Sequence, residues 1–384
     1  MTANYDAVVA GAGPGGLASV AALLDAGAQR ILWVDPEWRG GRLNGMYREI
    51  SSNTTVAIYL KAIYSSAAFR SIIDSTPAPH AITRLEEMDH NSTCQLSIAG
   101  DMICMLIDGL LARPEVEKLV GKVEEARLEN TTWAITTTPT IPDQPITAHR
   151  LILSTGSHPK RPNTHEHHNP SMKTLDLDTC MQRSRLPALL PADTPLKIAV
   201  IGNSHSGILV VRNLYELAES GTRTLKILNF YHRPIKYAVY TDDGIIFDNT
   251  GLKGATAEWA KTVLEKDPDR NIVESVCVSE DEEAVLAREL PSCTHLVYAV
   301  GYERGPLPRV VVDGKRVEGV LEFDMRSSGF KVPGKGEVRG LFGAGIAFPE
   351  EVKDLEGHVE AAVGMAKFVS FTQRVKGRWM GLEG

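Results

Sequence analysis

A glycine-rich loop near the N-terminus restricts what this chain can fold into. Residues 5–10 have the composition of a short β-strand and lead directly into the run GAGPGG at residues 11–16. An alanine- and leucine-rich stretch follows at 17–26, and a second apolar run at 31–34 ends on Asp35. Strand, glycine loop, helix, strand and acid, in this order, are typical of a Rossmann-type dinucleotide-binding unit.

Each part of this unit has a physical role. Gly11 permits the tight turn, Gly13 lets the backbone approach a pyrophosphate, and Gly16 lets the helix pack closely on the strand. The N-terminus of the helix offers unpaired N–H groups and the positive end of its dipole to the same pyrophosphate. Asp35 would accept hydrogen bonds from ribose hydroxyls. The residues expected to bind this first dinucleotide are Gly11, Gly13, Gly15, Gly16 and Asp35; the alternative is an ordinary glycine-rich turn.

A second unit of the same order begins about 190 residues later. An apolar strand at 197–201 leads into the loop GNSHSG, and residues 208–219 have apolar side chains at helical spacing. Gly202 and Gly207 stand where Gly11 and Gly16 stood, but Ser204 takes the place of the middle glycine. A Cβ at that position crowds an approaching phosphate. We expect this loop to bind a second nucleotide, and the alternative is a degenerate site.

The residues after the next strand (225–230) indicate which nucleotide the second unit takes. No acid follows this strand, and the sequence instead runs through His232 to Arg233. A guanidinium can bind a 2′-phosphate with two hydrogen bonds, whereas an acid would repel it. Arg233 therefore favours NADPH over NADH, unless it is only a solvated loop residue.

Two further strands each end in a glycine turn. Residues 151–153 lead into an S-T-G turn ending at Gly156, and residues 295–300 lead into Gly301. With the two nucleotide units, this order resembles the flavoproteins that have two dinucleotide-binding domains, and is nearest to the class B and N-hydroxylating flavin monooxygenases. The resemblance covers nearly the whole chain. It implies an α/β fold of two Rossmann-like, three-layer nucleotide-binding domains, with the NAD(P)H domain inserted into the FAD domain.

The same resemblance implies where the domains lie. Residues 1–194 would form the first part of an FAD-binding domain, 195–302 the NAD(P)H-binding domain, and 303–384 the return to the FAD domain. Gly156 and Gly301, at the two crossings between domains, would contact the cofactors.

The last part of the chain indicates which branch of this family the sequence resembles. The run GLFGAGIA at 340–347 resembles the family's glycine segment beside the flavin, which implies that Gly345 and Ile346 contact FAD. Disulfide reductases carry an Asp where Ile346 stands, and none of the five cysteines forms a C-x-x-C pair. Such a pair takes electrons from the flavin, so a thiol–disulfide enzyme is excluded. Residues 162–170 lack the F-x-G-x-x-x-H signature that many class B monooxygenases carry there.

Three more residues become candidates through this resemblance. Arg42 follows a Gly-Gly turn and would neutralise the pyrophosphate or a reduced flavin, and otherwise is a surface charge. Asn53 would hydrogen-bond the reacting flavin or the substrate; alternatively it caps a helix over 56–73. His358 precedes an expected helix over 359–368 whose N-terminus would face the flavin, and it would be a catalytic neighbour of that ring.

The histidines at 165, 167 and 168 invite comparison with a metal site. Their spacing is not the i, i+4 spacing of a helix, no cysteine lies near them in the sequence, and prolines flank them. A solvated loop is the better interpretation, and we expect no metal.

Charge and hydropathy exclude several partners. Lys and Arg number 41 against 48 Asp and Glu, with no basic block, which argues against a nucleic-acid partner. No apolar run approaches the roughly 18–20 residues of a membrane span. The N-terminus lacks the features of a signal peptide, so we expect a cytoplasmic protein, with a homodimer as one arrangement.

The family resemblance therefore implies an FAD-dependent oxidoreductase. The resemblance implies an NADPH-dependent monooxygenase that oxygenates a small organic molecule with dioxygen through a flavin hydroperoxide. One alternative is a flavin oxidase or dehydrogenase that takes electrons from its organic substrate and keeps a degenerate NAD(P)H domain. Another is a non-catalytic nucleotide-binding sensor.

Overall fold

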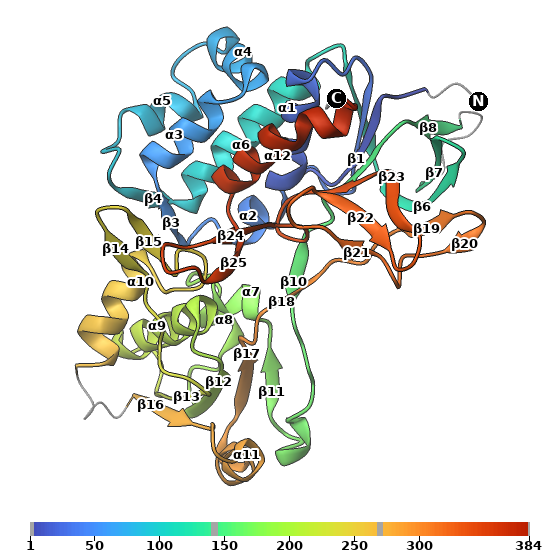
Figure 1. Cartoon of the computed structure of the whole chain (residues 1–384). Helices are drawn as coiled ribbons and strands as arrows, with labels where there is room; N and C mark the ends of the chain where they lie inside the picture. The colour runs from blue at the N-terminus through green and yellow to red at the C-terminus, as the bar shows by residue number, and fades with distance from the viewer. Residues whose placement is uncertain (1–3, 140–144, 267–271, 383–384) are drawn as a thin grey trace.

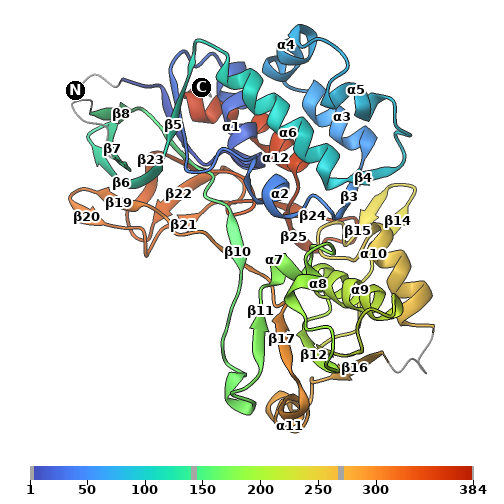
Figure 2. The same cartoon turned by 180° about the vertical axis from the view of Figure 1, so that it is seen from behind.

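The chain forms two lobes, which Figures 1 and 2 show from opposite sides. The computed structural model describes residues 4–139, 145–266 and 272–382. The first lobe contains both the N-terminal and the C-terminal segments, and the second lobe contains the middle of the chain. The two predicted Rossmann-like domains, one inserted into the other, are confirmed by this arrangement.

A seven-stranded sheet forms the centre of the first lobe. Its strands, in spatial order, are β21 (Glu322–Phe323), β22 (Gly329–Val332), β23 (Gly336–Gly343), β9 (Leu151–Leu153), β1 (Ala7–Ala10), β2 (Ile31–Asp35) and β5 (Val116–Val120). The five strands from β23 to β5 run parallel. Ala7 and Val9 pack in the core on one face, and Val8 and Ala10 in the core on the other. Burial of both faces explains why β1 reads as a continuous apolar run.

Helices cover one face of this sheet and a second sheet covers the other. The helices are α1 (Pro14–Asp25), α2 (Gly41–Met46), α3 (Val56–Tyr64), α4 (Ala67–Ser75), α5 (Ala81–Glu86), α6 (Leu96–Leu111) and α12 (Met365–Met380). The second sheet has the order β20 (Lys315–Arg316), β19 (Arg309–Val312), β6 (Lys122–Glu129), β7 (Thr132–Thr138), β8 (Ile146–Ala148). A short pair, β3 (Ser51–Thr55) and β4 (Thr93–Gln95), lies at the edge that faces the second lobe.

The second lobe is a parallel sheet with helices on both faces. Its strands, in order, are β11 (Lys173–Leu175), β17 (His295–Tyr298), β12 (Leu196–Ile201), β13 (Leu225–Tyr231) and β16 (Val273–Cys277). The helices are η1 (Glu166–His168), α7 (Leu177–Cys180), α8 (Leu186–Leu189), α9 (His205–Glu219), α10 (Gly254–Trp259), η2 (Ala260–Leu264), α11 (Glu282–Glu289) and η3 (Leu290–Ser292). Two hairpins, β14 (Val239–Thr241) with β15 (Gly244–Ile246) and β24 (Glu350–Lys353) with β25 (Val359–Ala362), lie between the lobes.

The chain crosses between the lobes along an antiparallel ribbon. β10 (Ser157–Pro159) leads out of the first lobe, and β18 (Tyr302–Arg304) leads back and pairs with it. Because β11 and α7 already belong to the second lobe, strand pairing favours a start of the inserted domain near residue 160. We therefore propose a boundary near residue 160 in place of the predicted boundary at 194/195.

Two local expectations differ from the structure. Residues 359–368 do not form one helix, because β25 occupies 359–362 and α12 begins at Met365. The burial of β25 alternates residue by residue, which is the period of a strand, and Gly364, at φ 137°, separates it from the helix. The expected helix over 56–73 is two helices, α3 and α4, because Ser66 caps α4 by accepting the N–H of Phe69.

Among the described residues, no single helix has the length and apolar composition needed to cross a membrane. Only α3 and α4 taken together pass that test, and they are bent by 102° at their junction.

Candidate active site at the junction of the lobes

The first glycine loop packs as its sequence predicts. Gly11 has a φ of +112°, and a Cβ there would overlap the carbonyl oxygen of Ser154. A Cβ on Gly16 would overlap the carbonyl oxygen of Gly11. The tight turn and the close packing of α1 on β1 therefore both require glycine.

Two other glycine segments meet this loop. A Cβ on Gly13 would lie 3.5 Å from the Cα of Gly41, and one on Gly15 would lie 2.7 Å from the Cα of Gly345. No side chain caps the N-terminus of α1, so its first N–H groups lack a side-chain acceptor. This surface of bare backbone beside uncapped N–H groups fits a bound pyrophosphate.

Buried polar atoms without partners lie in segments next to this loop. Within the described ranges, Ser154 Oγ, Thr155 Oγ1 and Trp38 Nε1 are buried and form no hydrogen bond. Buried polar groups are normally paired, so these atoms fit a site that is completed by a polar ligand. We did not predict these three residues, although Ser154 and Thr155 belong to the S-T-G turn.

Asp35 organises the loop. Its carboxylate accepts the N–H of Ala12 at 2.7 Å, and those of Glu37 and Trp38 at 2.7 Å each. These bonds fix the carboxylate at the end of β2, next to the glycine loop. Binding of a ribose by Asp35 remains a prediction.

Arg42 joins the lobes. Its guanidinium forms an ion pair with Asp178 of α7, whose side chain is 1% exposed. Tyr47 donates a hydrogen bond from Oη to the other oxygen of this carboxylate, at 3.0 Å. A buried carboxylate needs such partners, since leaving its charge unpaired is costly. Nearby, burial and the adjacent Tyr47 raise the pKa of Tyr302. The proposed pyrophosphate contact of Arg42 remains a prediction, and Asp178 had no recognisable signal in the sequence.

The second glycine loop repeats the packing of the first. Gly202 has a φ of +112°, and a Cβ there would overlap the carbonyl oxygen of Ala299. A Cβ on Gly207 would overlap the carbonyl oxygen of Gly202. Ser204 is the exposed N-cap residue of α9 and makes no side-chain capping bond. The loop thus has the shape of a nucleotide site, with one added hydroxymethyl group.

Arg233 lies beside this second loop. It follows β13, it is exposed, and its carbonyl oxygen accepts a 2.7 Å hydrogen bond from Asn203 Nδ2. We find no ion pair between its guanidinium and any residue of the described ranges. Gly156 and Gly301, with φ of 72° and 97°, form the turns that border the β10–β18 ribbon.

The structure brings Asn53 and the second loop together. Asn53 Nδ2, on β3 of the first lobe, lies 3.3 Å from Nδ1 of His205, the first residue of α9. Burial, with the nearby Lys253 ammonium, lowers the pKa of His205 to about 4, so its ring is neutral at pH 7. Asn53 donates this bond, which makes Nδ1 the acceptor and places the ring proton on Nε2. Asn53 is not the cap of α3, because that N-cap residue is Thr55.

His358 lies in a different cluster. It is exposed in the turn between β24 and β25, with Nδ1 2.9 Å from Asp354 Oδ2 and its ring 4.6 Å from that of Phe247. Asp354 also accepts the N–H of Phe247 at 3.1 Å, and its hydrogen bonds lower its pKa to about 2 although burial opposes this. These contacts join the hairpin to the second lobe, and none of them involves Asn53. Ile346 is 42% exposed.

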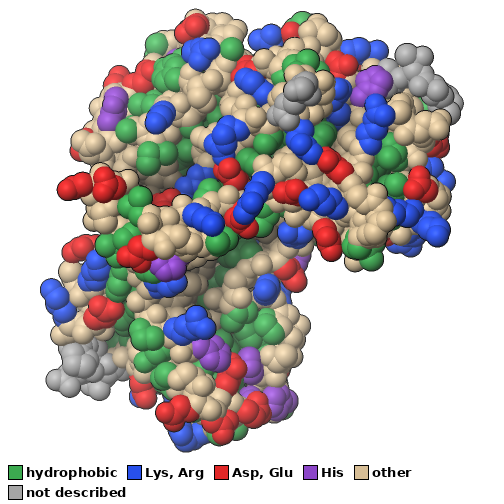
Figure 3. Space-filling model, viewed as in Figure 1, with side chains coloured by type: hydrophobic (Ala, Val, Ile, Leu, Met, Phe, Trp, Pro, Cys, Tyr) green, Lys and Arg blue, Asp and Glu red, His purple; other side chains and the backbone are tan. Residues whose placement is uncertain are grey.

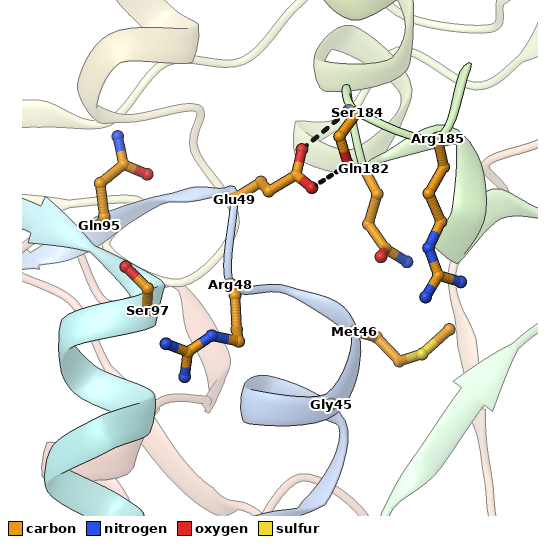
Figure 4. Close-up of a pocket in the computed structure, with 9 residues that line it drawn as sticks. All are labelled: Gly45, Met46, Arg48, Glu49, Gln95, Ser97, Gln182, Ser184 and Arg185. Carbon is orange, nitrogen blue, oxygen red and sulfur yellow. Dashed lines mark hydrogen bonds between the residues drawn. The ribbon is translucent and has the colours of Figure 1, made fainter. Parts of the chain in front are cut away.

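Two cavities open between the lobes. One, of about 740 Å³, is drawn in Figure 4, where Glu49 of the first lobe accepts the N–H of Ser184 of the second at 2.9 Å. Arg48 and Arg185 also line it. The other, of about 710 Å³, lies among α3, α12 and the two hairpins. Both have the volume of small-molecule sites.

Comparison with known proteins gives three results. No family model matches the chain. The chain is 39% identical over 389 residues to "Monooxygenase AgnR1" of Paecilomyces divaricatus, covering 97% of each protein. Its fold is similar to that of a mutant flavin monooxygenase from Stenotrophomonas maltophilia (TM-score 0.60, 12% identity, all of both chains). It is also similar to DfoA bound to FAD, the cadaverine monooxygenase of Erwinia amylovora (TM-score 0.64, 13% identity, 99% and 94% of the chains).

Proposed function

Because the chain belongs to the same monooxygenase family as AgnR1 and has the two-lobed fold of flavin monooxygenases, we propose that it is an FAD- and NADPH-dependent monooxygenase. Its substrates are a small organic molecule and dioxygen. A cytoplasmic location, a homodimer and the absence of nucleic-acid and membrane partners stay predictions.

The first lobe would hold FAD. The pyrophosphate would lie on the uncapped N-terminus of α1, against Gly13 and Gly41, and the ribose beside Asp35. The unpaired hydroxyls of Ser154 and Thr155 would bond the polar groups of the cofactor. The structurally similar DfoA is bound to FAD, and OTEMO, another protein of similar fold, forms a complex with FAD and NADP.

The second lobe would hold NADPH on the loop from Gly202 to Gly207. The uncapped N-terminus of α9 would receive the pyrophosphate. Arg233, exposed and adjacent to Asn203, would receive the 2′-phosphate. We also propose that Gly301 and Ile346 contact the cofactors, as the sequence predicts.

The main observation that supports this proposal is the hydrogen bond between Asn53 and His205. It places the first-lobe strand expected near the flavin within 3.3 Å of the loop expected to bind the nicotinamide nucleotide. The two cofactors would therefore meet at this junction. The bound flavin would supply the redox and oxygen chemistry, and the chain supplies positioning, exclusion of water and electrostatics. Asn53 offers amide hydrogens there, and the neutral His205 adds no positive charge.

Visible absorption of the purified protein tests this function. We expect flavin bands that bleach with NADPH under anaerobic conditions and return on admitting air. Bands that NADPH leaves unchanged would favour the oxidase alternative, for which Ser204 in the second loop is the supporting feature. A colourless protein that takes up no added FAD would contradict the proposed function.

Arg233→Ala should raise the KM for NADPH much more than the KM for NADH. Removal of a bidentate guanidinium–phosphate contact costs about 1.5–3 kcal/mol, so the KM for NADPH should rise roughly 10- to 100-fold. The KM for NADH should change less than about threefold, because NADH has no 2′-phosphate. The measurement is steady-state NAD(P)H oxidation, with Arg309→Ala, an exposed arginine of the first lobe, as the control. Equal changes for the two nucleotides would contradict the assignment.

A further inference from the structure

A histidine cluster lies in the second lobe, outside the proposed cofactor sites. His167 and His168 belong to η1, and Glu283 to the first turn of α11, 115 residues further along the chain. Figure 3 shows histidine and acidic side chains together at the lower end of this lobe. The sequence argued against a metal because the histidines do not have helical spacing, no cysteine lies near them and prolines flank them. The fold supplies a further ligand, Glu283.

Two distances within the cluster match those between ligand atoms around a tetrahedral metal ion. Glu283 Oε1 lies 3.5 Å from His167 Nε2 and 3.5 Å from His168 Nε2, and the three atoms lie within 4.8 Å of one another. Ligand atoms bound to zinc at about 2.0–2.2 Å in a tetrahedron lie about 3.3–3.5 Å apart. An ion can therefore enter after small rotations of the side chains.

The two imidazoles offer their Nε2 atoms. His167 Nδ1 lies 2.8 Å from the carbonyl oxygen of Thr164, which can only accept, so Nδ1 holds the proton and Nε2 keeps its lone pair. This is the outer hydrogen bond that metal-binding histidines usually form. The His168 side chain is 6% exposed, and its Nε2 is buried without a hydrogen bond to any described residue. A buried nitrogen that lies 3.5 Å from a carboxylate oxygen and is left without a hydrogen bond points to a missing partner.

We propose that His167, His168 and Glu283 bind a divalent transition-metal cation of the zinc class, with water completing the coordination. Two imidazoles and one carboxylate suit zinc and its neighbours rather than Mg²⁺ or Ca²⁺, which prefer oxygen ligands. His167 and Glu283 are 61% and 70% exposed, so solvent delivers the ion to the site. The ion joins the segment between β10 and β11 to α11. Glu282 precedes Glu283 in the chain, and its carboxylate lies 3.5 Å from His232, the residue before Arg233. The bound ion would therefore stabilise the segment at the edge of the proposed NADPH site.

Calorimetric titration of the untagged, EDTA-treated protein with ZnCl₂ tests the site. We expect one ion per chain with a micromolar or lower Kd, and no binding of MgCl₂. Glu283→Gln and His167→Gln should each weaken zinc binding at least tenfold. Both side chains are exposed, so these variants remain informative even where a variant of the buried His168 does not fold.

Glu282→Gln is the matched control, since it removes the same charge from the same helical turn without removing a ligand. Its zinc affinity should stay within about threefold of the wild type. Zinc at 100 times the wild-type Kd should raise the Tm of the wild type by about 3 °C and that of Glu283→Gln by less than about 2 °C. Equal affinities of the wild type and Glu283→Gln, or no binding at all, would overturn the proposal. None of these readouts depends on flavin or on activity.

Discussion

Replacing Gly13 with alanine should leave the chain folded and remove its FAD. The new Cβ would lie 3.5 Å from the Cα of Gly41, which is an ordinary van der Waals contact. It would, however, stand on the bare surface where the backbone is proposed to approach the pyrophosphate. We expect FAD affinity to fall at least 100-fold, about 3 kcal/mol, with little change in far-UV circular dichroism. Fluorescence titration of the apoprotein with FAD measures the effect.

Two further glycines control this experiment. Gly319→Ala adds a Cβ into open space and should keep the wild-type affinity for FAD. Gly16→Ala places its Cβ on the Gly11 carbonyl oxygen, so it should lower the yield of folded protein itself. Wild-type FAD content in Gly13→Ala would refute the proposed position of the pyrophosphate.

Replacing Asn53 with alanine should abolish most oxygenation while FAD stays bound. A hydrogen bond to a charged reacting group contributes about 1.5–3 kcal/mol, so product formation should fall roughly 10- to 100-fold. NADPH oxidation should continue, because Asn53 lies on β3 and belongs to neither glycine loop. The product formed per NADPH consumed, measured by chromatography, is therefore the quantity that should fall.

His205→Ala shows whether Asn53 acts directly or through its bond across the lobes. This variant also loses the 3.3 Å contact but keeps the Asn53 amide. If both variants lose the same product yield, the bond between the lobes is what matters, and the proposed contact of Asn53 with the reacting group is wrong. Asn203→Ala, in the second loop, is the matched amide control and should change NADPH binding more than coupling.

The structural units that could be predicted are those whose residues lie within about 30 positions of one another in the sequence. In each glycine loop the strand, turn and helix are consecutive, so their packing depends on neighbours such as Gly11 and Gly16. Asp35 was selected as a candidate for the same reason, and its contact with a ribose stays a prediction. The insertion of one domain into the other was predicted from the family resemblance that the order of these units carries.

Contacts between distant segments could not be predicted. Asn53 and His205 are 152 residues apart, and Arg42 and Asp178 are 136 apart, so no local pattern relates them. Glu283 is equally remote from the histidines that it approaches. His358 was placed directly before an expected helix because residues 359–368 are mostly apolar, and a strand followed by Gly364 has the same composition.

The β10–β18 ribbon has a consequence for how this architecture is inherited. Pro159 pairs with Tyr302, so the two ends of the inserted lobe lie one strand spacing apart, about 5 Å. A whole lobe attached at two adjacent points can be gained, lost or exchanged as a cassette without interrupting the sheet that it leaves. Recombination at these two points would give the flavin-binding half a different source of electrons.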